Sequence, residues 1–246
     1  MADSTDRFFI PGISRQDRCA VPRDEAHHIT HVLRMAVGDE LIAFDGTGAE
    51  CRCRIATASG HKVILEVLER REVSREPDAA VTLAIAAAKN KAMDLIVQKC
   101  TELGLARLIP FHAGRSVARI DDSAKIEKWR RVTIEAAKQC GRNVLPRIDE
   151  PRDLDALLAA AREHDLAVVA AVAEKNVSLK QVLCEHPQAR KIMYVIGPEG
   201  GFAPDELARI TGAGIAAVSL GRSVLRVETA AIAALAMIVY HYGNEC

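Results

Sequence analysis

The chain has 246 residues, 49% of them hydrophobic and 27% charged, with 33 basic and 33 acidic side chains. This is an ordinary balance for a soluble globular protein, and the length allows one large core or two smaller ones. Residues 1–6 lack the basic and apolar parts of a secretory signal, and the longest apolar run, residues 230–240, is too short to cross a bilayer. We therefore expect a cytoplasmic protein without a membrane partner.

The cysteines and histidines predict neither disulfides nor a metal site. The seven cysteines are an odd number without a C-x-x-C pair, and Cys51 and Cys53 fall on one face of a predicted strand, as core thiols do. His27 and His31 have the i, i+4 spacing of metal ligands, but no third ligand accompanies them. A reducing compartment fits this pattern.

The charge is unevenly distributed although its sum is zero. Residues 89–147 carry 13 basic and 6 acidic side chains, a net charge of +7, whereas residues 1–88 carry 11 and 14, a net charge of −3. A locally basic region in a neutral protein is what a polyanion-binding face requires. Solvated lysines on long helices are the alternative interpretation.

The first part of the chain is predicted to be a small β-rich domain. Alternating apolar residues predict antiparallel strands at 40–44, 51–56 and 62–68, separated by turns with Gly46, Gly48 and Gly60. A short helix is expected over residues 27–35. These elements suggest a compact barrel over residues 1–73, and the charged segment 69–78 is interpreted as a linker.

The rest of the chain, residues 77–246, alternates between predicted strands and helices. This alternation predicts an α/β fold with a parallel sheet and helices on both faces. The expected strands are residues 81–88, 107–111, 166–172, 192–196 and 216–219, and the expected helices are residues 93–103, 125–140, 154–162, 179–184, 204–210 and 227–242. Asp153 is the expected cap of one helix. Ala203 is a poor cap for another, so either that helix starts nearer Asp205 or neighbouring contacts hold its end.

Two glycine-bearing turns follow two of the predicted strands. One is residues 196–202, after the strand at 192–195, and the other is residues 220–226, after the strand at 216–219. Ligands of open α/β sheets bind at the carboxyl ends of strands, so the two turns could wrap one small, flat ligand with main-chain hydrogen bonds. Neither turn has the dinucleotide or triphosphate fingerprint, and Glu199 would repel a polyphosphate.

The two turns resemble those of a known family. Residues 195–202 read Val-Ile-Gly-Pro-Glu-Gly-Gly-Phe, and residues 220–230 read Leu-Gly-Arg-Ser-Val-Leu-Arg-Val-Glu-Thr-Ala. Both are similar to motifs of the bacterial 16S ribosomal RNA uracil-N3 methyltransferases, which belong to the SPOUT superfamily. Further similarities at residues 7–9, 28–35, 89–104 and 135–143 extend the resemblance over nearly the whole chain in the right order.

The resemblance implies a fold, a cofactor and partners. The fold would be a SPOUT domain with a knotted (trefoil) parallel sheet at residues 77–246, preceded by a PUA-like β-barrel at residues 1–73 that assists RNA binding. The cofactor would be S-adenosyl-L-methionine, and helix 227–242 would form much of a homodimer interface. The substrate would be a decoding-region uridine in the 16S ribosomal RNA of the small ribosomal subunit. The implied cofactor-binding residues are Ala171, Val172, Ile196, Gly197, Pro198, Glu199, Gly200, Gly201, Leu220, Gly221, Ser223, Val224, Leu225, Arg226 and Thr229.

Methylation at uracil N3 asks for two further kinds of residue. N3 carries a weakly acidic proton, so one group must take the proton and a cation must stabilise the uridylate. Glu228 and Arg226 are the candidate catalytic residues, although Glu228 could equally serve the dipole of the last helix, and the arginine could contact a phosphate. The candidate RNA-binding residues are Arg7, His31, Arg34, Lys89, Lys91, Arg115 and Arg142.

Two functions from other classes compete with this interpretation. A non-catalytic RNA-binding module is disfavoured because both glycine turns are intact. A nucleotide-binding enzyme of Rossmann type is disfavoured by the missing fingerprint and by Glu199.

Overall fold

The computed structural model describes residues 6–59, 62–86, 90–116, 123–171 and 177–243. Contacts divide the chain into two compact units. The first comprises residues 1–76 together with 137–145, and the second comprises residues 77–136 together with 146–246. The sequence had placed the boundary between residues 73 and 77, but it did not predict that residues 137–145 join the first unit.

The first unit is built on a five-stranded sheet with the order β1-β3-β4-β5-β2. Its strands are β1 (Arg7–Phe9), β2 (Arg18–Ala20), β3 (Glu40–Phe44), β4 (Ala49–Ser59) and β5 (Lys62–Glu72). The expected antiparallel pairing holds for β3, β4 and β5. The strands β1 and β2 were not predicted; β2 pairs antiparallel with β5, whereas β1 runs parallel to β3. The predicted linker at 69–78 is too long, because β5 continues to Glu72 and pairs with the start of β4.

The helical part of this unit differs from the single helix expected over residues 27–35. A short helix α1 (Arg23–His27) continues into a π-helical segment η2 (His28–Val32), and a 3-10 turn η1 (Ile13–Arg15) lies earlier in the chain. Arg34 follows with φ of 57°, a left-handed conformation that residues other than glycine seldom adopt. The segment therefore ends in an exposed, locally constrained arginine.

Residues 137–145 are held in the first unit by side-chain contacts. Arg7 donates to the side-chain oxygen of Asn143 at 2.5 Å, and Asn143 donates in turn to the carbonyl of Val73 at 2.9 Å. Arg142 is only 3% exposed and forms an ion pair with Glu76. This segment is thus an integral part of the barrel unit.

The second unit contains a seven-stranded sheet in which every pair of neighbouring strands is parallel, with the order β10-β12-β9-β11-β6-β7-β8. The strands are β6 (Ala80–Ala86), β7 (Arg107–Phe111), β8 (Arg147–Ile148), β9 (Leu166–Ala170), β10 (Val177–Ser178), β11 (Lys191–Ile196) and β12 (Ala216–Ser219). The short strands β8 and β10 were not predicted. The predicted fold class is confirmed, and the knot that the resemblance implies stays a prediction.

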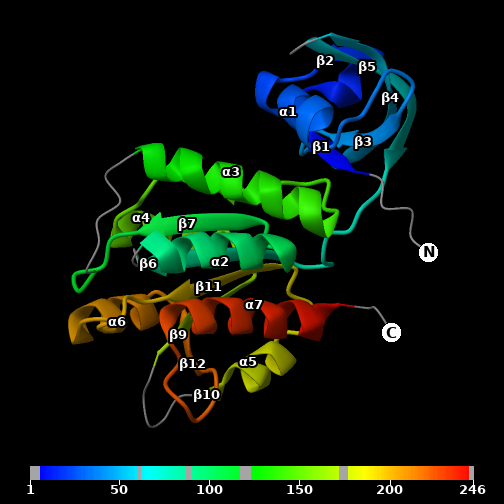
Figure 1. Ribbon diagram of the computed structural model, residues 1–246. Coiled ribbons are helices and arrows are strands. Elements are labelled where there is room, and N and C mark those ends of the chain that lie inside the picture. The colour runs from blue at the N-terminus through cyan, green and yellow to red at the C-terminus, as the bar shows by residue number, and fades with distance from the viewer. Residues whose placement is uncertain (1–5, 60–61, 87–89, 117–122, 172–176, 244–246) are drawn as a thin grey trace. The chain divides into compact units, whose positions relative to one another are not determined.

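Helices cover both faces of this sheet. Successive strand residues point to opposite faces, so they are buried under different helices. Leu83 and Tyr194 pack with one group of helices, and Ala84 and Met193 pack with the other. The first group is α2 (Asn90–Glu102), α3 (Ser123–Cys140), α5 (Leu179–Glu185) and α7 (Val227–Tyr242), and the second is α4 (Leu154–Ala161) and α6 (Pro204–Gly212). Figure 1 shows α7 lying beside α2. Asp153 caps α4 as expected, accepting the N–H of Ala156 at 2.8 Å.

Helix α7 has one buried and one exposed side. The buried side faces the core of the second unit, where the hydroxyl of Tyr194 donates to the carbonyl of Ala231 at 3.1 Å. Ala234 is 2% exposed and lies on that side, whereas Met237 is 43% and Tyr240 89% exposed on the other. The apolar run at 230–240 is therefore only partly explained by packing within one chain.

A buried carboxylate binds three arginines at the β8 edge of the sheet. Asp149, just after β8, has a side chain that is 3% exposed and binds Arg107 at 2.6 Å, Arg147 at 2.8 Å and Arg152 at 2.8 Å. Burial by itself would raise the pKa of Asp149, but the hydrogen bond and charge of Arg107 and the charges of the other two arginines outweigh it and hold that pKa below 3.8.

Among the described residues, no helix has both the length and the apolar character needed to cross a bilayer. The same residues contain no cluster of three or more histidines, cysteines or carboxylates arranged to hold a metal ion. Cys51 and Cys53 are buried in the barrel core, and burial raises the pKa of the Cys53 thiol to about 12.

Replacing Asp149 by Asn should lower the free energy of unfolding by about 3 kcal/mol, because three arginines lose a shared buried counter-charge. Urea denaturation at pH 7 measures this change. Asp155→Asn is the matched control, since Asp155 is 80% exposed and pairs only with Arg209 among the contacts of the described residues.

The difference in unfolding free energy between wild type and Asp149→Asn should depend on pH. The pKa of Asp149 is lower in the folded than in the unfolded chain, so its contribution is present above the unfolded value and is lost as the pH falls through the folded one. The stability difference between wild type and Asp149→Asn should therefore shrink in acid. A difference that stays constant down to the acid limit of folding contradicts this assignment.

Candidate active site

A pocket of about 1260 Å³ opens at the carboxyl ends of β11 and β12. Both glycine turns contribute to it, together with residues of α2, α6 and α7. Its lining is formed by Lys91, Ala92, Leu95, Ala170, Ala171, Ile196, Gly197, Pro198, Glu199, Gly201, Phe202, Leu207, Val218, Ser219, Leu220, Gly221, Arg222, Ser223, Val224, Leu225, Arg226, Val227, Glu228 and Ala230. The position agrees with the general rule for ligands of open α/β sheets.

The first turn depends on a glycine that leaves room for an aromatic ring. A Cβ atom at Gly197 would lie 2.7 Å from the ring of Phe202, which is too close for any real side chain. The Phe202 ring also stacks on Phe111 of β7, with ring centroids 6.3 Å apart. A backbone hydrogen bond of 2.8 Å from the N–H of Gly201 to the carbonyl of Pro198 closes the turn.

The second turn depends on a glycine for a different reason. Gly221 has φ of 139°, a conformation that residues with a side chain rarely adopt. The hydroxyl of Ser219 accepts the N–H of Gly221 at 3.2 Å and donates to its carbonyl at 2.9 Å. Ser219, at the end of β12, thus stabilises this turn through its side chain.

The start of α6 explains how an alanine can occupy its cap position. The Glu206 carboxylate accepts the N–H of Ala203 at 2.9 Å, so a neighbouring side chain satisfies the helix end. The second alternative from the sequence, that other contacts hold the end, is therefore correct. The other oxygen of Glu206 accepts the N–H of Gly114 at 2.7 Å, and Arg115 donates to the carbonyl of Gly200 at 3.4 Å.

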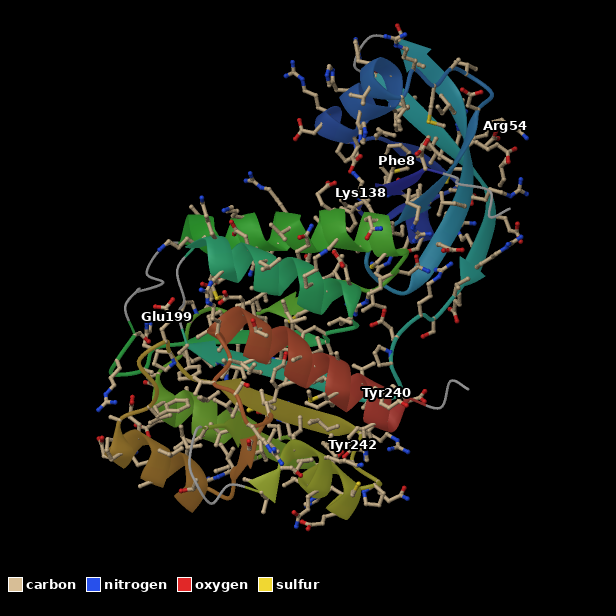
Figure 2. The ribbon with its side chains drawn as sticks, turned by 60° about the horizontal axis from the view of Figure 1, so that its bottom comes forward. Phe8, Arg54, Lys138, Glu199, Tyr240 and Tyr242 are labelled. Carbon is tan, nitrogen blue, oxygen red and sulfur yellow. The ribbon has the colours of Figure 1, made fainter. Side chains whose placement is uncertain are left out.

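Charged side chains of both signs line the pocket. Lys91 comes from α2, Arg226 occupies the cap position of α7, and Glu228 lies in the first turn of that helix. Glu199 is exposed on the first turn, and Figure 2 shows it at the opposite end of α7 from Tyr240. The lining combines apolar surface and turn backbone with a few charges, which suits a small organic ligand.

Most of the expected cofactor residues lie together in this lining. Val172 is outside the described residues, and Gly200 and Thr229 are exposed next to the lining rather than in it. The expected catalytic pair, Arg226 and Glu228, also faces the pocket. Whether these residues hold a cofactor stays a prediction at this point.

The sequence did not reveal which residues of the helices and strand ends line the pocket. Leu95 and Leu207 line the pocket from α2 and α6, and Phe202 shapes the first turn. Apolar residues at helical spacing give no sign of whether they face a core or a ligand. Ser219 is the exception, because a serine before a glycine is a recognisable turn signal.

Two of the expected RNA-binding residues are engaged elsewhere. Arg142 is buried in its ion pair with Glu76, and the side chain of Arg7 is 14% exposed and binds Glu50 at 2.9 Å. Both guanidinium groups are thus paired with a carboxylate of the chain, and their role in RNA binding stays a prediction. The expected residues that lie exposed are His31, Arg34, Lys91 and Arg115, while Lys89 is outside the described residues.

The basic count of residues 89–147 overstates the positive surface. At least seven of its basic side chains form ion pairs, many with carboxylates from other parts of the chain. They are Lys99, Arg107, Lys128, Arg130, Lys138, Arg142 and Arg147. Figure 2 shows Lys138 beside Phe8, and its ammonium lies 2.9 Å from the Glu25 carboxylate. The predicted polyanion-binding face is thus smaller than the net charge of +7 suggested.

A small β-rich unit followed by a parallel sheet, with a pocket lined by two glycine turns, has the domain order of a class of RNA methyltransferases that two family models describe. The family model described as "RNA methyltransferase domain" matches residues 74–239, and that described as "RNA methyltransferase PUA domain" matches residues 21–68. A relative from Bacillus subtilis, named ribosomal RNA small subunit methyltransferase E, is 34% identical over 95% of this chain and 96% of its own length. The same name belongs to a relative from Mycobacterium tuberculosis, 35% identical over 89% of this chain and 84% of its own.

Solved structures agree with these relatives. A ribosomal RNA small subunit methyltransferase E from Neisseria gonorrhoeae, bound to S-adenosyl methionine, is 26% identical, with a TM-score of 0.89 over 98% of this chain and 100% of that one. A methyltransferase from Legionella pneumophila with bound SAM is 32% identical, with a TM-score of 0.87 over 95% and 96%. The chain belongs to the family of ribosomal RNA small subunit methyltransferase E, a group of SPOUT-type RNA methyltransferases.

Proposed function

We propose that this protein transfers a methyl group from S-adenosylmethionine to N3 of one uracil in the decoding region of 16S ribosomal RNA, in the cytoplasm. The observation that carries the proposal is the pocket between the two glycine turns, in a chain whose relatives are ribosomal RNA methyltransferases. A solved relative in this family is bound to S-adenosyl methionine. The uracil and its N3 atom come from the family resemblance of the sequence motifs.

The pocket lining has the chemistry that S-adenosylmethionine needs. Apolar side chains such as Ile196, Val218 and Leu225 offer a surface for the adenine ring, and the turns offer backbone N–H and C=O groups for its edge. The exposed carboxylate of Glu199 attracts the positive charges of the donor. When bound, the donor supplies an electrophilic methyl group on a positively charged sulfur.

The protein must handle the N3 proton and the charge that its removal leaves. N3 lies on the Watson–Crick edge, so the uracil has to leave its pairing partner before it can enter the pocket. Glu228 is our candidate acceptor of the proton, and the guanidinium of Arg226, two residues earlier, stabilises the negative charge on the uracil oxygens. Glu228 lies in the first turn of α7, where it lines the pocket.

RNA binding relies on the cations that the structure leaves exposed. Of the expected RNA-binding residues in the second unit, Lys91 is exposed at the pocket and Arg115 beside the first turn. In the barrel unit, Arg34 is exposed at the end of the π-helical segment, near His31. Phosphate contacts by such side chains fix the position of the RNA without reading its sequence.

The experiment that tests this function is nucleoside mapping of small-subunit RNA. Small subunits isolated from a strain that lacks the protein should gain one methyl group per subunit when incubated with the protein and S-adenosylmethionine. Mass spectrometry should place that group in 3-methyluridine. Binding of NAD or ATP in preference to S-adenosylmethionine, seen by calorimetry, would point to a nucleotide enzyme instead. Failure to bind any of the three would point to an RNA-binding module.

Gly197→Val and Gly221→Val should each abolish S-adenosylmethionine binding in calorimetry. In the first variant the new side chain displaces Phe202, and in the second the backbone cannot keep its conformation. Gly212→Val is the matched control, because Gly212 lies in open space at the end of α6 with an ordinary φ. Wild-type affinity in both pocket variants would remove the turns from the donor site.

We also propose that the protein acts as a homodimer through the exposed side of α7. Met237→Asp should separate the subunits, because it places a charge in an apolar contact, and activity should fall with the loss of RNA contacts from the partner. Light scattering during size-exclusion chromatography measures the mass. Ala208→Asp, on the exposed surface of α6, serves as control. Ala234 is unsuitable as a test site because it is buried within one chain. A dimeric Met237→Asp protein contradicts this arrangement.

A further inference from the structure

Glu206 joins two loops at the same edge of the sheet. One carboxylate oxygen accepts the N–H of Ala203, at the end of the first glycine turn, and the other accepts the N–H of Gly114, in the loop after β7. The two distances, 2.9 and 2.7 Å, are those of good charge-assisted hydrogen bonds. Capping of α6 would need only the first of them.

Residues 111–115, at the start of the loop that Glu206 holds, lie against the first glycine turn. Phe111 stacks on Phe202 where the loop begins. Further on, a Cβ atom at Gly200 would lie 3.7 Å from the Cβ of Arg115, so the two backbones approach closely. A hydrogen bond of 3.0 Å from the N–H of Ser116 to the carbonyl of Ala113 closes a turn over residues 113–116. The loop therefore presents Arg115 beside the pocket.

Among the contacts of the described residues, the side chain of Arg115 has one hydrogen bond. Its guanidinium is exposed and reaches the carbonyl of Gly200 at 3.4 Å, which is long for a hydrogen bond. Such a contact exchanges readily for a phosphate oxygen. The bond between Glu206 and Gly114 is short and charge-assisted, so it is the stronger tie between the loop and the turn.

We infer that Glu206 is a positioning residue that couples the donor-binding turn to the RNA-binding side chain of Arg115. This inference rests on the proposed function, and it assigns to Glu206 a role beyond the capping of α6. Glu206 lies outside the pocket lining and so does not act on the reacting atoms. By binding both loops, Glu206 fixes the position of Arg115 relative to the first glycine turn, and from this position Arg115 contacts a phosphate of the RNA.

A double-mutant cycle of Glu206→Gln and Arg115→Ala tests the coupling. Glutamine has nearly the same shape as glutamate, but its single carbonyl oxygen can serve only one of the two N–H groups. Arg115→Ala should raise KM for small ribosomal subunits about tenfold in the wild-type background, the effect of one charge-assisted contact, with little change in kcat. In the Glu206→Gln background it should raise KM less than about twofold, because Arg115 is no longer held in position.

The control is Asp205→Asn, which removes one negative charge from the same helix turn. Asp205 is exposed, and the cycle of Asp205→Asn with Arg115→Ala should be additive. If Glu206 only caps α6, its cycle with Arg115→Ala is additive as well, and the inference is overturned. Glu206→Ala provides a second cycle with the same expected loss of additivity.

Two further measurements separate this inference from the proposed function. Calorimetry of Glu206→Gln with S-adenosylmethionine should show binding within a few-fold of wild type, since the pocket residues are unchanged. A wild-type protein that fails to methylate small subunits overturns the proposed function. A wild-type protein that methylates them, together with an additive Glu206 cycle, overturns the inference alone.

Discussion

The space beside Gly197 is the constraint on which the pocket edge of the second unit depends. The ring of Phe202 fills the position that a side chain at residue 197 would need, so the chain after β11 can fold back tightly on itself. This fold-back brings Phe202 onto Phe111 and starts α6 at Pro204. It also places Glu206, one turn into the helix, within reach of two loops. The absence of a side chain at Gly197 therefore determines the path of the turn, the start of α6 and its contact with the loop after β7.

The sequence predicted the elements whose signals are local. The bounds of β7, β12 and α7 agree with the predicted ranges, because apolar runs bounded by glycine, proline or charge mark such elements clearly. The parallel partner of β1 and the two-residue strands β8 and β10 were missed, since each exists only through a partner far along the chain. The π-helical segment was read as an ordinary helix because its composition does not distinguish the two.

The site could be predicted where it consists of backbone turns and not where it depends on charge partners. Gly197 and Gly221 are visible in the sequence because the conformations they permit are rare for other residues. Arg7 and Arg142 looked like RNA contacts, yet they stabilise the barrel unit through Glu50, Asn143 and Glu76. A count of basic residues cannot show which of them already have a carboxylate, because that depends on folding. The role of Glu206 could not be predicted from the sequence, since its second partner lies in a distant loop.

The membership of residues 137–145 in the first unit has a consequence for how the protein can be divided. The chain passes between the two units three times, after Glu76, after Ala136 and after Leu145. The family model for the PUA domain covers residues 21–68 alone, and the model for the methyltransferase domain includes residues 137–145. Neither stretch coincides with a compact unit, because residues 1–76 without residues 137–145 would lack Asn143 and leave Arg7 without one of its partners. Gene fusion or domain exchange at a single cut would therefore damage both halves, and the two units are expected to be inherited together.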